Sequence, residues 1–124
     1  MKQILLVEDD PLYSKILSYI LENNGYIVEC AANGLQGMEM IKEKTYDLIV
    51  TDILMPSATG LDLLDKIKRD ITSKGTKVIV LSLMTSDFYL SESLSRGADE
   101  YLRKPVTAKD LLQSVRRHLL KPAA

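Results

Sequence analysis

Short runs of aliphatic residues alternate along the chain with longer segments in which apolar residues recur every three or four positions. Aliphatic runs typical of buried strands lie at residues 3–7, 46–51 and 77–82. Residues 26–30, with β-branched Ile27 and Val28, are also strand-like, and residues 100–103 form a brief fifth predicted strand. Each run is followed by a segment with helical periodicity. The first helix is expected to begin at Asp10-Pro11, a capping residue followed by proline, and the last one is expected after Thr107. The pattern predicts five strands that alternate with five helices.

Apolar residues at helical spacing mark the first of these helices. In the first helix, Leu12, Ile16 and Ile20 recur every four residues, and Leu17 and Leu21 lie beside them. Residues at this spacing share one face of a helix, so the pattern predicts a helix here.

The order of the elements favours an α/β fold. Each strand is separated from the next by a crossover segment that includes a helix, which parallel strands require. The chain has about half the length of an eight-stranded barrel. We therefore predict a single domain over residues 1–124, a (βα)5 doubly wound open parallel sheet. Such sheets place their functional sites beyond the carboxyl ends of the strands.

Composition excludes several classes of function. The chain has 124 residues, 46% of them hydrophobic, and its net charge of -1 provides no broad positive field for direct nucleic-acid binding. No apolar run approaches the roughly 20 residues that a membrane span needs, so membrane insertion is not expected. The single cysteine, Cys30, excludes an internal disulfide and a multi-cysteine zinc site. These features predict a cytoplasmic protein.

Polar side chains gather at the carboxyl ends of four of the five predicted strands. Glu8 and Asp9 follow the first strand, Asp52 the third and Lys104 the fifth, while Ser82 is the last residue of the fourth. An acid in such a position is often only a loop residue or a helix cap, but the joint placement of these five indicates a site. Three carboxylates brought together repel one another and favour a bound cation, and an all-oxygen ligand set suits Mg²⁺. A carboxylate in such a site, here Asp52, can act as the nucleophile in phosphoryl transfer.

Four ordered motifs also carry a family resemblance. They are the segments 4–11 (ILLVEDDP), 47–56 (DLIVTDILMP) with Gly60, 78–82 (VIVLS) and 97–105 (GADEYLRKP). Over essentially its whole length the sequence resembles the receiver domains of two-component response regulators. The resemblance implies a flavodoxin-like sheet with strand order 2-1-3-4-5.

The same resemblance implies roles for the acidic residues. Asp52 would be the phosphoacceptor, and Asp9, Asp52 and the backbone carbonyl of Leu54 would bind Mg²⁺, with Mn²⁺ as the alternative ion. Glu8 would assist at this metal site.

It also implies roles for residues near the last two strands. Lys104 would contact the phosphoryl oxygens, and the peptide bond between Lys104 and Pro105 would be cis. Ser82 would reach towards the new phosphoryl group, and Tyr101 would move inward with it as the second part of a switch.

The function implied is a phosphorylation-activated signalling switch. It would accept a phosphoryl group from a histidine kinase or a histidine phosphotransfer domain. It would then control a downstream protein through its fourth helix, fifth strand and fifth helix. It would not be an enzyme for other substrates, since it catalyses only its own phosphoryl transfer and dephosphorylation. The five units use nearly the whole length, so no output domain is expected, and phosphorylation-dependent homodimerisation is a further hypothesis.

Two alternatives remain open at this point. One is a receiver-type docking module that works without phosphorylation. The other is a flavodoxin-like electron carrier, which the acids of residues 8–10 disfavour because they would repel a flavin phosphate.

The sequence departs from the family pattern at Leu83, where a small residue is usual. Leu83, together with Leu54 and Met84, would shield the phosphoryl group from water and prolong its lifetime, or Leu83 would instead pack into the core.

Overall fold

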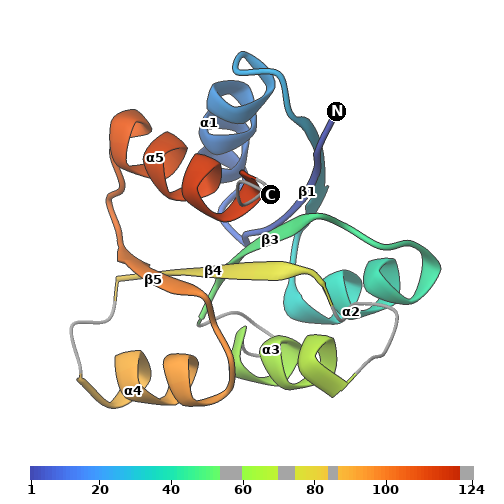
Figure 1. The fold of residues 1–124 in the computed structure, drawn as a ribbon, viewed down its shortest axis with the longest axis vertical. Helices are drawn as coiled ribbons and strands as arrows, with labels where there is room; N and C mark the ends of the chain where they lie inside the picture. The colour runs from blue at the N-terminus through green and yellow to red at the C-terminus, as the bar shows by residue number, and fades with distance from the viewer. Residues whose placement is uncertain (54–59, 70–74, 84–86, 121–124) are drawn as a thin grey trace.

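The computed structural model describes residues 1–53, 60–69, 75–83 and 87–120. Within these residues, five strands alternate with five helices (Figure 1). The strands are β1 (Gln3–Val7), β2 (Ile27–Ala31), β3 (Leu48–Asp52), β4 (Lys77–Ser82) and β5 (Glu100–Arg103). The helices are α1 (Pro11–Glu22), α2 (Gly34–Glu43), α3 (Gly60–Arg69), α4 (Asp87–Ser95) and α5 (Ala108–Leu119).

The strands form one parallel sheet in the order β2-β1-β3-β4-β5, which confirms the predicted fold class and topology. Helices α1 and α5 cover one face of the sheet, and α2, α3 and α4 cover the other (Figure 1). Since all strands run in the same direction, their carboxyl ends lie along one edge, where polar residues that are far apart in sequence meet.

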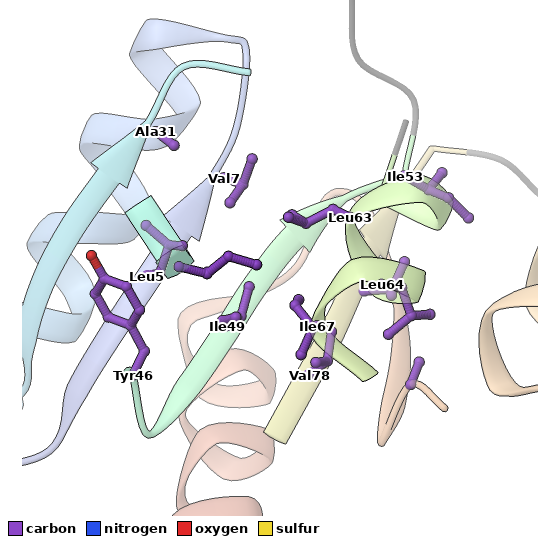
Figure 2. Packing of buried hydrophobic residues seen from close by; sticks show 13 residues of the cluster. Leu5, Val7, Ala31, Tyr46, Ile49, Ile53, Leu63, Leu64, Ile67 and Val78 are labelled. Atoms are coloured by element: carbon purple, nitrogen blue, oxygen red, sulfur yellow. The ribbon is translucent and has the colours of Figure 1, made fainter. Parts of the chain in front are cut away.

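Two apolar clusters fill the spaces on either side of the sheet. Successive side chains of a strand point to opposite faces, so Leu5 and Ile49 join the cluster under α2 and α3 (Figure 2). Ile4 and Leu48 join the cluster under α1 and α5. All five residues of β3 are buried, as expected for a central strand covered on both faces.

The strand bounds agree with the prediction for β1, β4 and β5 and differ by one or two residues for β2 and β3. Strand β2 begins at Ile27 because the preceding Tyr26 N–H donates to Leu21 O and so continues the turn that ends α1. Strand β3 extends through Asp52 because the parallel ladder with β4 continues to the pair Asp52 and Leu81.

Both predicted helix caps are confirmed. The Asp10 carboxylate accepts hydrogen bonds from the backbone N–H groups of Leu12 and Tyr13, and the Thr107 hydroxyl accepts one from Asp110 N–H. These contacts satisfy backbone donors that the first turn of a helix leaves without an intrahelical partner.

The sheet covers only part of the apolar surface of α1. Leu12 and Ile16 are 67% and 47% exposed, whereas Leu17 and Leu21 are buried against the sheet. Apolar residues surround more than half of this helix, so periodicity alone did not choose between neighbouring stripes. The approach of α1 to Ile4 and Leu6 of β1 decided which stripe is covered.

None of the helices among the described residues is both long enough and apolar enough to cross a lipid bilayer.

Candidate functional site

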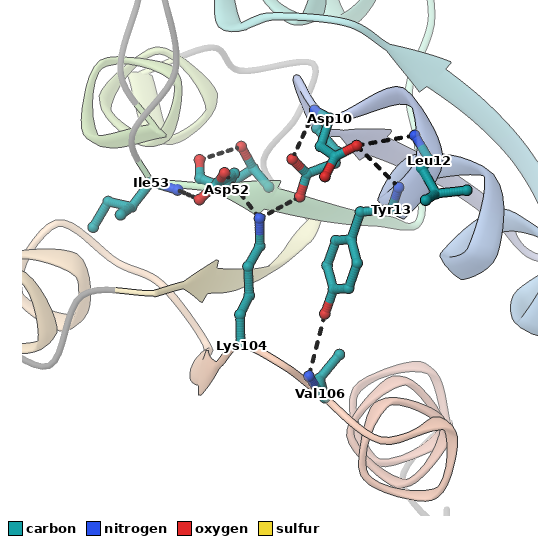
Figure 3. A network of polar contacts seen from close by, with 9 residues as sticks. Asp10, Leu12, Tyr13, Asp52, Ile53, Lys104 and Val106 are labelled. Carbon is teal, nitrogen blue, oxygen red and sulfur yellow. Dashed lines mark hydrogen bonds and ion pairs between the residues drawn. The ribbon is translucent and has the colours of Figure 1, made fainter.

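The carboxyl edge of the sheet brings the predicted polar residues together. The register places Val7 of β1 opposite Thr51 of β3, so the residues that follow these two become neighbours. Glu8 and Asp52 therefore lie side by side, although 44 positions separate them in the chain. Lys104 follows β5 and reaches both acids across the end of β4, as Figure 3 shows for Asp52.

Lys104 forms two ion pairs in this site. Its Nζ donates to Glu8 Oε1 at 2.5 Å and to Asp52 Oδ2 at 3.0 Å. The three side chains are almost removed from solvent, with exposed fractions of 10% for Lys104, 1% for Glu8 and 11% for Asp52. Ion pairs at this depth are screened much less by salt than pairs on the surface.

Backbone amides fix the two carboxylates. Ile53 N–H donates to Asp52 Oδ1 at 2.7 Å, and Asp10 N–H donates to Glu8 Oε2 at 3.1 Å. Each carboxylate therefore has one oxygen held by the backbone and the other held by Lys104. Both acids are oriented by the fold before any ligand arrives.

Burial sets the electrostatics of the pair. Desolvation raises the pKa of Glu8, and the hydrogen bonds from Lys104 and from Asp10 N–H offset only part of that rise. Burial also acts to lower the pKa of Lys104, but the hydrogen bonds to Glu8 and Asp52 outweigh it, so the pKa of Lys104 is raised. Lys104 therefore stays protonated at neutral pH and balances part of the acidic charge.

The acids that the sequence marked as metal ligands also lie together. Glu8, Asp9 and Asp52 each place one carboxylate oxygen within 4.8 Å of the others, and Asp9 is exposed to solvent while the other two are buried. The Lys104 ammonium pairs with two of these three carboxylates, and hard oxygen donors of this kind suit a divalent cation. This acidic cluster can bind a metal ion. The fourth predicted ligand, the carbonyl of Leu54, lies outside the described residues.

The residues predicted to switch lie close to this edge. Ser82 ends β4 and is buried, and Tyr101 is half-buried on β5, where it packs against the cluster under α2 and α3. The peptide bond between Lys104 and Pro105 is cis, as the resemblance implied.

Leu83 does not pack into the core, which makes one of its two interpretations wrong. It is 73% exposed, because the ladder between β4 and β5 ends at the pair Ser82 and Arg103 and the next residue leaves the sheet. Met84, the third member of the hypothetical shield, lies outside the described residues, as does Leu54.

Tyr13 also lies at this edge, although no sequence motif marked it. The Lys104 ammonium lies 4.8 Å from the centre of the Tyr13 ring, and Val106 N–H donates to the Tyr13 hydroxyl at 3.2 Å (Figure 3). Its position could have indicated this place, because Tyr13 lies in the first turn of the helix after β1, and that turn begins at the carboxyl edge of the sheet. Helical periodicity classified Tyr13 only as part of α1.

Comparison with known proteins identifies the family. The response regulator receiver domain family matches residues 4–116. The chain belongs to this family. The receiver domain is similar to the transcriptional regulatory protein CusR of Escherichia coli, at 33% identity over 98% of this chain and 53% of CusR. It also resembles the hybrid signal transduction histidine kinase B of Dictyostelium discoideum, at 34% identity over 95% of this chain and 7% of the kinase. The chain thus spans about half the length of CusR and a small part of the hybrid kinase.

Solved structures of receiver domains have the same architecture. The chemotaxis protein CheY4 of Vibrio cholerae superimposes with a TM-score of 0.90 at 29% identity, covering 96% of this chain and 99% of CheY4. A CheY-like receiver domain from Methanospirillum hungatei gives a TM-score of 0.88 at 35% identity, covering 94% and 92% of the two chains. The chain is therefore a receiver domain of the response-regulator family, in which signalling in general depends on phosphorylation.

Proposed function

We propose that Asp52 is the phosphoacceptor of this receiver domain and that it takes the phosphoryl group from a histidine kinase or a histidine phosphotransfer domain. The observation that carries the proposal is the placement of the Asp52 carboxylate, which is buried, held by Ile53 N–H and 3.0 Å from the Lys104 ammonium. Catalysis of phosphoryl transfer consists mainly of positioning and charge stabilisation, and both are present around Asp52.

In the proposed reaction, an Asp52 carboxylate oxygen attacks the phosphorus of a phosphohistidine. A new P–O bond forms while the P–N bond breaks, and its electron pair returns to the imidazole nitrogen, which then takes a proton. The Lys104 ammonium moves from a carboxylate oxygen to an oxygen of the transferred group, where it offsets the added negative charge.

Glu8, Asp9 and Asp52 would hold the divalent cation, which we propose to be Mg²⁺ with Mn²⁺ as a substitute, and the Leu54 carbonyl is the further predicted ligand. When bound, the ion would neutralise charge on the phosphoryl oxygens. The three carboxylate oxygens within 4.8 Å of one another support this assignment.

The output would be a change of surface. The added phosphoryl oxygens would attract the Ser82 hydroxyl, and Tyr101 would move with it, which changes the face formed by α4, β5 and α5. A downstream protein, or a second phosphorylated copy of this chain, would bind that face. The domain would act on no other substrate.

Light scattering with and without a phosphoryl mimic tests the homodimer, since an unchanged monomer at high concentration contradicts it.

Small phosphodonors test the phosphoacceptor directly. The protein is incubated with phosphoramidate and Mg²⁺, and intact mass is measured. We expect one added phosphoryl group in the wild type and in the control Asp110→Asn, an exposed acid of α5, and none in Asp52→Asn. An addition that survives Asp52→Asn refutes the assignment. No addition to the folded wild type favours the docking module that works without phosphorylation.

A further inference from the structure

Tyr13 connects three parts of the molecule that meet at the acidic site. It belongs to the first turn of α1, and it packs against the apolar cluster between α1, α5 and the sheet. Its ring lies beside the Lys104 ammonium, with 4.8 Å between Nζ and the ring centre. Its hydroxyl accepts a hydrogen bond from Val106 N–H, just beyond Lys104 and Pro105. One side chain therefore contacts both the charged end of Lys104 and the segment that follows it.

The Tyr13 ring restricts the position of the Lys104 ammonium in a way that the two acids do not. A lysine ammonium has three donors on a flexible four-carbon stem, so two carboxylate partners do not by themselves fix where it lies. Attraction between a cation and the face of an aromatic ring strengthens when water is excluded, and the Lys104 side chain is only 10% exposed. The Tyr13 contact does not depend on which oxygen the ammonium pairs with. It would therefore be kept while Lys104 exchanges a carboxylate partner for a phosphoryl oxygen.

The hydroxyl acts on the backbone. Val106 is the first residue after Pro105 with an N–H to donate, and that N–H is directed to Tyr13. Val106 packs against the same apolar cluster as the Tyr13 ring. The hydrogen bond thus joins the start of α1 to the connection between β5 and α5.

We propose that Tyr13 is a positioning residue for Lys104, which its ring holds beside Asp52 before and during phosphoryl transfer, while its hydroxyl anchors the segment after Pro105. This inference rests on the proposed function of Asp52. It predicts different consequences for loss of the ring and for loss of the hydroxyl.

Three variants separate these effects. Tyr13→Leu removes the ring, Tyr13→Phe removes only the hydroxyl, and Tyr19→Leu is a matched control because Tyr19 lies on the same helix and is 68% exposed. Phosphorylation of Asp52 by subsaturating phosphoramidate in Mg²⁺ is followed by intact mass, under conditions where urea titration shows each variant fully folded.

We expect the rate to fall about fivefold in Tyr13→Leu, which corresponds to about 1 kcal/mol at 1.36 kcal/mol per tenfold. Tyr13→Phe stays within about twofold of the wild type but unfolds at lower urea, since Val106 N–H loses its partner. Tyr19→Leu is unchanged.

A double variant tests whether Tyr13 acts through Lys104. In a Lys104→Met background, Tyr13→Leu is expected to cause no further loss of rate. An equal fivefold loss in both backgrounds would mean that Tyr13 acts on the fold in general, and this would overturn the proposal. An unchanged rate in Tyr13→Leu, with normal phosphorylation of the wild type, would also overturn it while leaving the function of Asp52 intact.

Proton NMR of the Lys104 ε-methylene group gives a readout that needs no phosphorylation. In the wild type and in Tyr13→Phe, the aromatic ring current is expected to move these signals upfield, and Tyr13→Leu is expected to return them to the ordinary lysine position. Signals that do not change in Tyr13→Leu refute the contact. If the wild type takes no phosphoryl group at all, the proposed function fails, and the NMR result still decides whether Tyr13 positions Lys104.

Discussion

Replacement of Lys104 by methionine tests the electrostatics of the site without any ligand. Methionine keeps an unbranched apolar stem but removes the charge, so Glu8 and Asp52 remain as two buried carboxylates without the cation that pairs with both of them. Removal of one partner from a buried ion pair typically costs about 3–5 kcal/mol of stability.

The acids themselves limit this loss, because Glu8 can take up a proton. At pH 7, protonation of a carboxyl with the ordinary pKa of 4.5 costs about 3.4 kcal/mol at 1.36 kcal/mol per unit, and at pH 5 it costs about 0.7 kcal/mol. A carboxyl whose pKa is raised by folding destabilises the fold above its ordinary pKa, and this penalty disappears as the pH falls towards that value. Lys104→Met is therefore expected to lose about 3 kcal/mol at pH 7 and less than about 1 kcal/mol at pH 5.

Urea unfolding in EDTA at both pH values measures these losses. With a slope of about 1.5–2 kcal/mol per molar urea, the loss at pH 7 lowers the midpoint by about 1.5–2 M. Lys77→Met is the matched control, because its side chain is 49% exposed and its ammonium lies 3.9 Å from Asp99 Oδ1. It is expected to change stability by no more than about 0.5 kcal/mol at either pH. A loss in Lys104→Met below about 1 kcal/mol at pH 7, or an equal loss at both pH values, would refute the reasoning.

Three further predictions concern the fold. Asp10→Ala removes the cap of α1 and is expected to cost about 1 kcal/mol in urea unfolding, whereas Asp10→Asn, which keeps an acceptor, loses less. Leu17→Ala is expected to cost about 2–5 kcal/mol and Leu12→Ala about 0.5 kcal/mol or less; similar losses would contradict the observed orientation of α1. Burial acts to raise the pKa of Glu100, but hydrogen bonds from three α5 side chains outweigh it and the pKa is lowered. The stabilisation is therefore present above its ordinary value of 4.5 and is lost as the pH falls below it. In Glu100→Gln, the melting temperature is therefore expected to fall less than in the wild type as the pH is lowered below 4.5. An equal fall in both proteins would contradict this prediction.

Much of the fold could be predicted because its signals are local. The bounds of β1 and β4 follow from their aliphatic runs, and Asp10 and Thr107 cap helices through atoms only two or three residues away. Where the local pattern left a choice open, the deciding contact was distant in sequence. Leu12 and Leu17 are both good apolar helix residues, and packing on the sheet alone determined that Leu17 is buried.

The candidate site divides in the same way. The residues that form the site could be predicted from their positions at the ends of the strands, because a parallel sheet brings the carboxyl ends of its strands to one edge. The sequence by itself therefore determined the fold class, the strand order through its family resemblance, and the group formed by Glu8, Asp9, Asp52 and Lys104. Tertiary structure alone decided that one ammonium pairs with both buried acids and that the Tyr13 ring lies beside it. The physical reason is that distances, burial and pKa shifts depend on how side chains from separate elements pack, and local periodicity carries no information about that packing.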